Sequence, residues 1–355
     1  MDFGICTASK IDEIGYITHA ENLGYSHAWI ADSQMIWSDC YAVLALAAQQ
    51  TRRMKIGTGV SVAGTRLAPV TANSIATINQ LAPGRTFLGI GTGNTATRLM
   101  GHKPMKLKEF AEYLRVLRAL LRGQEVDFTW QGQTHPVQFL MQDHKFINVE
   151  EPIPLYVSGF GPKAQALAGE YGEGLVMSVP PNPGFMHRAL QNAEAGAQRA
   201  GRSLADDFYT ASLTTVVMLR PGESLASERV LRECGAFVIA SIHYLYDKIR
   251  QFGGDPPGHL RQIWDEYSAQ VEATPETHRH MRIHAGHCTY LLPEEAKFVT
   301  PELIKSTCLA GSPEEIIDQV RGLEQAGLKQ LMLLPSFETQ YQVIEDFAHQ
   351  VMDKL

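Results

Sequence analysis

Small polar residues and glycines, rather than a nucleophile beside a base, carry the candidate chemistry of this chain. The stretch Arg85–Arg98 reads RTFLGIGTGNTATR, in which a short apolar run typical of a buried strand leads into Gly91, Thr92, Gly93 and Asn94. Glycines let backbone N–H groups approach an anion or a flat ring. We interpret this loop as one wall of a cofactor site. A purely structural glycine turn is the alternative.

A second glycine-containing turn reads Ser158, Gly159, Phe160 and Gly161, directly before Pro162. It joins a predicted strand to a predicted helix that begins at this proline. The free N–H groups and the positive end of such a helix form a phosphate site. We therefore predict that this turn binds a phosphate, with an ordinary strand–helix turn as the alternative.

Other polar residues follow predicted strands and are weaker candidates. Asp32 could hydrogen-bond a ring edge or a substrate, or it could cap the next segment. Trp37 could stack on a flat ligand or belong to the core, and His102 could transfer a proton or lie in a solvated loop. A histidine-rich segment has spacing that matches no standard structural zinc site, so we predict no metal and expect it to line a lid or an interface. Its residues are His278, His280, His284, His287 and Cys288.

A dinucleotide fingerprint is the main competing interpretation of the first loop, because Gly91, Gly93 and Ala96 match it loosely. Such a site requires an acidic residue about twenty positions later, at the end of a second strand. Glu109 and Glu112 fall near that distance, but both lie in an amphipathic helical pattern. We therefore reject the dinucleotide hypothesis.

The elements that position these residues alternate strictly between strand and helix. Eight such units predict a (β/α)8 TIM barrel within a single domain, residues 1–355, rather than an open doubly wound sheet. Residues 124–150, after the fourth helix, and 222–305, after the seventh strand, depart from the pattern. The predicted strands are Asp2–Cys6, His27–Ala31, Lys55–Val62, Thr86–Ile90, Leu155–Ser158, Gly174–Ser178, Tyr209–Leu219 and Gln330–Leu334.

Composition and charge argue against some classes of binding partner. The chain has 355 residues, 45% of them hydrophobic, and a formal net charge of −7. The absence of a basic block argues against a nucleic-acid partner, and the lack of a long apolar run argues against a membrane partner. The five cysteines are scattered and form no CxxC pair, and no signal-peptide pattern is seen at Met1–Lys10. We expect a reduced, cytoplasmic protein.

Several of these stretches together resemble the bacterial luciferase-like superfamily, which contains flavin-dependent monooxygenases and reductases that use the deazaflavin coenzyme F420. The likeness is greatest to the branch named after methylenetetrahydromethanopterin reductase. It covers residues 1–177 and returns at 311–335. The stretches that carry it are Ala31–Gln34 with Trp37, Gly57–Val60, Thr65–Pro69, Asn73–Asn94 and Tyr156–Gly174.

The resemblance implies that the tricyclic ring of a flavin or deazaflavin lies at the carboxyl end of the barrel. Gly59 and Val60 match a bulged strand whose non-prolyl cis peptide backs the ring. By the same correspondence, Gly91–Asn94 line the cofactor chain and Ser158–Gly161 cradle its phosphate. Asp32 and Trp37 match positions that face the ring or the substrate.

One departure from the family pattern bears on chemistry. Some F420-dependent dehydrogenases carry an active-site histidine and a glutamate acid where this chain has Ser33 and Asn94. The proton-transfer pair of that subgroup is therefore absent, and sugar-phosphate dehydrogenation is not expected. Asp32, Trp37 and Asn94 remain the candidate catalytic residues.

We predict first an oxidoreductase that uses reduced FMN, supplied by a separate flavin reductase, for monooxygenation of a small organic substrate. The alternative is F420-dependent hydride transfer, and a third hypothesis is a non-catalytic flavin-binding protein. A homodimer or higher homo-oligomer is expected. Residues 222–305 are predicted to form a lid over the barrel or a dimer contact, with His243, Tyr244 or His287 facing the substrate.

Overall fold

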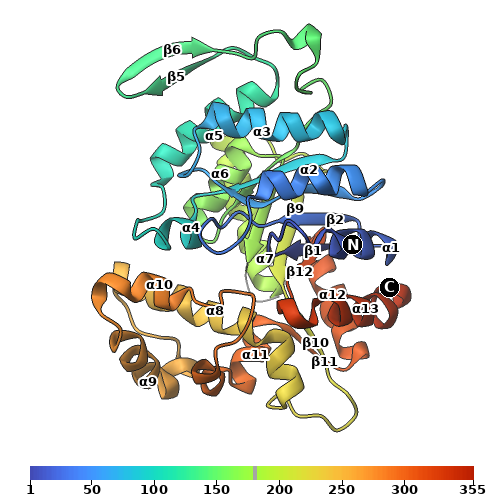
Figure 1. The fold of residues 1–355 in the computed structure, drawn as a ribbon, viewed down its shortest axis with the longest axis vertical. Helices are drawn as coiled ribbons and strands as arrows, with labels where there is room; N and C mark the ends of the chain where they lie inside the picture. Colours follow the sequence, from blue (N-terminus) through green and yellow to red (C-terminus); the bar gives the residue numbers. More distant parts are fainter. Residues whose placement is uncertain (179–181) are drawn as a thin grey trace.

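Eight parallel strands close into a barrel in this computed structural model, which describes residues 1–178 and 182–355 (Figure 1). Around the barrel the strand order is β1-β12-β9-β8-β7-β4-β3-β2. The predicted (β/α)8 TIM barrel is thus confirmed. The barrel strands are β1 (Asp2–Thr7), β2 (His27–Ile30), β3 (Lys55–Val62), β4 (Thr86–Gly91), β7 (Leu155–Ser158), β8 (Gly174–Ser178), β9 (Tyr209–Thr214) and β12 (Gln330–Leu333).

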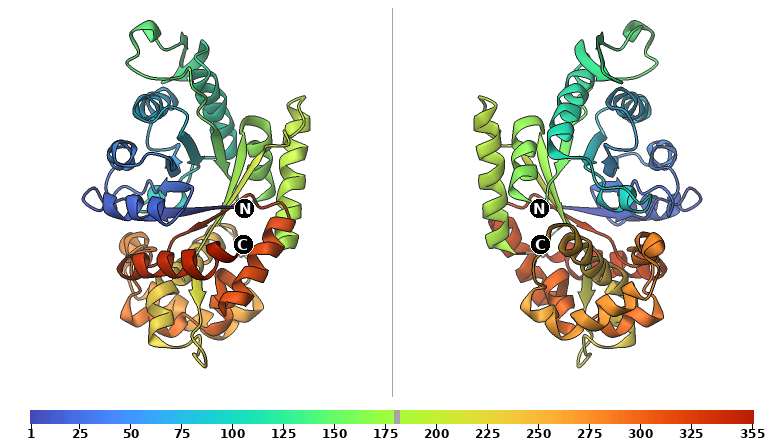
Figure 2. Two further views of the ribbon diagram at one scale, coloured as in Figure 1. Left: turned by 90° about the vertical axis from the view of Figure 1, so that its right-hand side faces the viewer. Right: turned by 90° about the vertical axis from the view of Figure 1, so that its left-hand side faces the viewer.

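Helices cover the outside of the barrel, as the two side views show (Figure 2). Their apolar faces pack on the strands, and their ends follow ordinary capping chemistry. A capping box is present at Ser312, whose hydroxyl accepts from the Glu315 N–H while the Glu315 carboxylate accepts from the Ser312 N–H. The outer helices are α1 (Ile14–Asn22), α2 (Cys40–Gln50), α3 (Ala68–Leu81), α4 (Asn94–Arg98), α5 (Leu107–Leu121), α6 (Pro162–Tyr171), α7 (Pro183–Arg199), α12 (Pro313–Gln325) and α13 (Gln340–Gln350).

Aromatic side chains fill the barrel interior. The rings of Trp29 and Phe87 lie 4.3 Å apart, and those of Tyr156 and Tyr209 stack at 5.2 Å. The indole N–H of Trp29 donates to Gln330 Oε1 at 2.9 Å. The same buried cluster continues without a break into the segment that follows β9. The barrel interior and this segment therefore share one apolar core.

Residues 124–150, which depart from the strand–helix pattern, contain an antiparallel hairpin. It consists of β5 (Val126–Trp130) and β6 (Gln133–Val137), with side chains that are mostly exposed. In Figure 1 the hairpin projects beyond α5 and α3, at the end of the molecule opposite α8.

The chain between β9 and β12 differs from the sequence-based prediction at Thr215. The predicted strand Tyr209–Leu219 is interrupted at Thr215, because the chain leaves the barrel there and β10 (Val216–Met218) pairs with β11 (Leu309–Gly311) instead. The first helix beyond β10 begins after a serine cap, Ser227. The helices here are α8 (Glu228–Phe252), α9 (Arg261–Glu272), α10 (Arg279–Ile283) and α11 (Pro301–Thr307).

Glu21, at the end of α1, joins that helix to the entrance of β3. Its carboxylate accepts from the backbone N–H groups of Arg52, Arg53 and Met54 at 3.0, 2.7 and 2.8 Å. Burial by itself raises the pKa of this carboxyl, but the three donors more than offset that effect, so the pKa lies below its ordinary value of 4.5. The stabilisation is therefore present above pH 4.5 and is lost as the pH falls through the lower, folded-state pKa.

We expect Glu21→Gln to lower the free energy of unfolding at neutral pH by about 1–2 kcal/mol, because a charged acceptor is replaced by a neutral one. The difference from the unmodified protein should shrink as the acid range is entered. Denaturant unfolding measured at several pH values tests both points. Glu125→Gln, at an exposed position, is the matched control and should change stability at no pH. A constant difference across the pH range would contradict the expected linkage.

No described helix combines the length and apolar character needed to cross a membrane. All five cysteines are free and buried.

Candidate functional site

The carboxyl ends of the barrel strands bring together the candidate residues of the first half of the chain, apart from His102. We call this end of the barrel the mouth. It is lined by Thr7, Asp32–Trp37, Gly59–Val60, Gly91–Asn94 and Ser158–Gly161. Ser178 closes β8 at the same end, and the residues after it, 179–181, lie outside the described part of the chain.

The Gly59–Val60 peptide bond is cis, as the family resemblance implies. The pairing of β3 with β4 shifts register between Thr58 and Ser61, which is the bulge expected at this point. Both residues of the cis bond are partly exposed. The thiol of Cys6, at the end of β1, lies 3.7 Å from the Gly59 carbonyl oxygen. The bulge of β3 therefore lies partly exposed at the mouth.

Asp32 is bound by several groups of the protein through one carboxylate oxygen. Its Oδ2 accepts from Arg66 Nη1 at 2.5 Å, from Ser61 Oγ at 3.2 Å and from the Val62 N–H at 3.2 Å. Arg66 also donates to Asp39 Oδ2 at 3.0 Å. Asp32 is 5% exposed. The carboxylate thus fixes the residues that follow the bulge, and this oxygen is committed to the protein.

The first glycine loop is compact for reasons of packing. A Cβ at Gly91 would come within 3.1 Å of Val60 and 3.3 Å of Ser158. Gly93 has a φ of +83°, and a Cβ there would lie 2.3 Å from Val62. Our interpretation that these glycines clear space for a ligand is therefore incomplete, because protein atoms occupy much of that space. Asn94 opens α4, and its Oδ1 accepts from Arg98 Nε at 2.8 Å.

The two glycines of the second turn, Ser158–Gly161, differ in how much space surrounds them. A Cβ at Gly159 would lie 2.8 Å from the Gln165 nitrogen, so the turn must approach α6 closely here. Gly161 has nothing within 4 Å of such a Cβ. It precedes α6, which begins at Pro162 without a side-chain cap. The exposed Phe160 ring stacks on Tyr244 of α8 at 5.4 Å.

The segment His284–Thr289, which belongs to residues 222–305, contacts residues of the mouth. Trp37 Nε1 donates to Thr289 Oγ1 at 3.1 Å, and the ring centroids of Trp37 and His287 are 6.0 Å apart. His287 Nε2 lies 3.4 Å from Thr95 Oγ1, on α4 beside Asn94. His102 is exposed, which agrees with the solvated-loop alternative.

Two further histidines of residues 222–305, His243 and His284, lie in different surroundings. His243 is buried in that core, where it contacts Glu295 Oε1 at 3.3 Å and stacks on Tyr267. The expectation that His243 faces the substrate is therefore not supported by its position. His284 lies behind His287, with ring centroids 5.5 Å apart. Within residues 1–178 and 182–355, no three His, Cys, Asp or Glu side chains are grouped to hold a metal ion.

Two arginines of the mouth were not among the sequence-predicted site residues. Arg66 pairs with Asp32, and Arg98 lies 3.5 Å from Asp247 Oδ2 of α8. Arg98 also donates to Gln251 Oε1 at 2.5 Å. For Arg98, the sequence signal was its helical spacing from Asn94. For Arg66, it was its position in a stretch that resembles the family. Neither signal identifies the partners, which are distant in the sequence.

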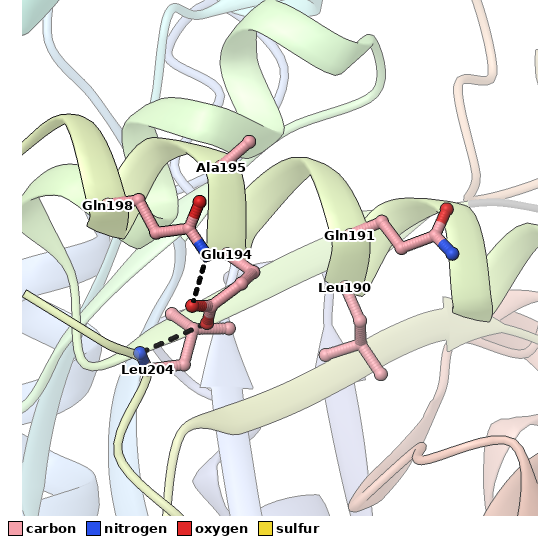
Figure 3. A pocket seen from close by; sticks show the side chains of 6 residues that line it. All are labelled: Leu190, Gln191, Glu194, Ala195, Gln198 and Leu204. Carbon is pink, nitrogen blue, oxygen red and sulfur yellow. Dashed lines mark hydrogen bonds between the residues drawn. The ribbon is translucent and has the colours of Figure 1, made fainter.

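Two surface hollows lie outside the mouth. One, on the outer side of α7, is lined by Leu190 and Glu194 among others, and Figure 3 shows Glu194 bound to Gln198 and the Leu204 N–H. The other lies between α5, α6 and α7, near the start of α6. Its cationic residues are Lys108, Lys163 and Arg199.

A family model described as luciferase-like monooxygenase matches residues 1–330. Over 321 residues the chain is 28% identical to a 5,10-methylenetetrahydromethanopterin reductase of Archaeoglobus fulgidus, covering 89% of this chain and 87% of that protein. It is 29% identical to an F420-dependent hydroxymycolic acid dehydrogenase of Mycobacterium tuberculosis over 58% of each chain. The solved F420-dependent tetrahydromethanopterin reductase of Methanopyrus kandleri superposes with a TM-score of 0.73, at 23% identity and 99% coverage of both chains.

Proposed function

Because the chain belongs to the luciferase-like monooxygenase family, we propose that it is an oxidoreductase that transfers a hydride between coenzyme F420 and a small organic molecule. The observation that supports this most is the similarity along 89% of the chain to a methylenetetrahydromethanopterin reductase. The similarity to an F420-dependent dehydrogenase supports it further. The order inferred from sequence, with reduced FMN first and F420 second, is therefore reversed.

The residues at the mouth fit a cofactor with a flat ring and an anionic chain. Partly exposed backbone at Gly59 and Val60 offers a surface without charge for the ring. At the start of α6 there is open space at Gly161 and no side-chain cap. Pro162 has no N–H and the Ala164 N–H donates to the Gly161 carbonyl oxygen, so the first turn offers the Lys163 N–H to a phosphate. Three cations line the neighbouring hollow. When bound, a deazaflavin supplies a ring carbon that accepts or donates a hydride.

We assign the parts of the site accordingly. Gly59 and Val60 back the ring, Gly91–Asn94 follow the chain of the cofactor, and Ser158–Gly161 hold its phosphate. Asp32 positions the bulge through Arg66 instead of touching the ring. Trp37 faces the ring or substrate from the side of residues 284–289.

Binding of the two cofactor types tests the proposal directly. We expect the purified protein to bind F420, seen as a change in cofactor fluorescence, with clearly higher affinity than FMN. Reduced F420 should then be consumed, or oxidised F420 reduced, with at least one small carbonyl, imine or alcohol compound. Preferential FMN binding, with a flavin hydroperoxide spectrum in air, would instead support monooxygenation, and cofactor binding without any turnover would support the non-catalytic hypothesis.

Gly161 allows a sharper test of the phosphate cradle. Gly161→Asp should fold normally, because its φ of −107° suits any residue and nothing lies near the added Cβ. A carboxylate at the start of α6 should weaken cofactor binding about tenfold, or about 1.4 kcal/mol, by repulsion of the phosphate. Gly161→Ala is the control and should bind as the unmodified protein does. Equal affinity for all three proteins would place the phosphate elsewhere.

A further inference from the structure

Resting on the proposed function, we propose that His287 is the catalytic residue that exchanges a proton with the substrate, and that the substrate is an uncharged alcohol or carbonyl compound. In this arrangement residues 222–305 act as a lid that delivers His287 to the mouth. The role is distinct from that of any residue of the barrel strands.

Hydride transfer to or from a carbon–oxygen bond requires a proton acceptor or donor at the oxygen. The first half of the chain does not place a free one at the mouth. Ser33 does not titrate in the relevant range, Asn94 is an amide bound to Arg98, and Asp32 is held by Arg66. The group must therefore come from elsewhere in the chain.

Contacts with Thr95 and Trp37 hold the imidazole of His287 at the mouth of the barrel. Its Nε2 lies 3.4 Å from Thr95 Oγ1, one residue beyond Asn94, and its ring faces Trp37. The neighbouring Thr289 is tied to the Trp37 indole at 3.1 Å. The apolar cluster that contains Cys288 also contains Cys6, Trp29 and other interior residues of the barrel. His287 is thus held at the end of the barrel by contacts on both sides.

The imidazole nitrogens here have unused hydrogen-bonding capacity. Nδ1 of His287, and both ring nitrogens of His284, are buried without a partner among the described residues. His284 is 3% exposed. Buried polar atoms are almost always satisfied in folded proteins, by protein, water or ligand. A ligand with a hydroxyl or carbonyl oxygen, entering from the mouth, would provide a partner for His287.

The charge around these rings selects an uncharged substrate. Burial lowers the pKa of His287 to about 3, assisted by His243, and burial together with His287 lowers that of His284 to about 2. Both rings are therefore neutral near pH 7. Arg66 and Arg98 are already paired with Asp32 and Asp247. These groups offer no free cation to a phosphate or carboxylate of the substrate.

The step balances as follows in the direction of alcohol oxidation. The O–H bond of the substrate breaks and its proton passes to the lone pair of a neutral His287 nitrogen. The adjacent C–H bond breaks, its hydrogen and electron pair leave as hydride to the oxidised cofactor, and the carbon–oxygen double bond forms. In carbonyl reduction the same atoms move in reverse: a proton taken up from solvent passes through a His287 nitrogen to the oxygen as the hydride arrives at carbon.

The test uses the full chain loaded with oxidised F420, and propan-2-ol, acetone and glucose 6-phosphate as probes. Imidazole nitrogen NMR resonances of His287, assigned by their loss in His287→Gln, should shift on addition of propan-2-ol or acetone and stay unchanged with glucose 6-phosphate. His287→Gln should retain F420 affinity and lower kcat for the alcohol by about 100-fold or more. His278→Gln, at an exposed position of the same segment, is the matched control and should keep both.

The outcomes separate this inference from the proposed function. Absence of F420 binding would overturn both. Binding of F420 without a response of His287 to the alcohol or ketone, or unchanged kcat in His287→Gln, would overturn only the role of His287. Oxidation of glucose 6-phosphate in preference to uncharged probes would overturn the substrate class.

Discussion

Asp32→Asn is expected to lower the free energy of unfolding by about 3 kcal/mol, the lower part of the range for breaking a buried ion pair. The substitution leaves the Arg66 guanidinium beside a neutral amide. It also weakens the bonds from Ser61 and from the Val62 N–H, which hold the chain after the bulge. We place the cost at the lower end because the Arg66 side chain is 19% exposed and keeps Asp39 as a partner. Equilibrium unfolding in denaturant measures it.

The second partner of Arg66 provides the control for this prediction. Asp39→Asn removes a carboxylate whose side chain is 58% exposed, so water replaces the lost interaction and the expected cost is below about 1 kcal/mol. If Asp32→Asn and Asp39→Asn lower the free energy of unfolding equally, burial of the Asp32–Arg66 pair does not stabilise this part of the barrel. Asp32→Asn should also weaken cofactor binding, since the residues beside Gly59 and Val60 lose their anchor.

The barrel could be predicted from sequence because its pattern is local and repeats. Each strand is a short apolar run, and some helices begin and end at recognisable residues, such as Ser312 and Gly327 around α12. The break at Thr215 could not be predicted in the same way. Val216–Met218 has the composition of a continuing strand, and it leaves the barrel only because Leu309–Gly311, far along the chain, offers a different pairing partner.

The position of the candidate residues in the barrel was predictable, but their side-chain interactions were not. The glycine loops lie at the mouth, as expected from their position after strands. The carboxylate of Asp32 is turned toward Arg66, a contact between residues 34 positions apart that no spacing rule supplies. Likewise, the contact between His287 and Thr95 spans 192 positions. Side-chain direction at a strand end depends on such partners, which only the folded chain defines.

Sequence patterns also could not decide which of the two cofactors, FMN or F420, is preferred. FMN and F420 both present a tricyclic ring, a ribityl chain and a phosphate, so Gly59, Val60 and Ser158–Gly161 would serve either. The difference between hydride transfer and oxygen activation depends on the ring itself. Our proposal of F420 is supported by similarity along 89% of the chain to a methylenetetrahydromethanopterin reductase and along 58% to an F420-dependent dehydrogenase, rather than by any single loop.

The packing of α6 against α7 makes Gly196→Ala the second prediction with a large expected effect. A Cβ at Gly196 would lie 1.8 Å from the Ala166 carbonyl oxygen, and a Cβ at Gly169 would lie equally close to that of Ala193. The two helices therefore touch backbone to backbone. The obstacle is a backbone atom, which cannot rotate away, so the helices must separate. We expect a loss of about 2–3 kcal/mol in unfolding free energy, typical of overpacking.

Displacement of α6 should also reach the site, because the first residue of α6 directly follows Gly161. Gly196→Ala should thus weaken F420 binding as well as stability, whereas a purely thermodynamic loss would leave the affinity of the folded protein unchanged. Gly322→Ala, in the middle of α12, is the matched control, since nothing lies within 4 Å of the added Cβ. There the helix propensity of alanine should raise stability by up to about 1 kcal/mol. Equal effects of the two substitutions would show that contact between α6 and α7 does not limit the fold, and unchanged F420 affinity in Gly196→Ala would separate the phosphate cradle from α6.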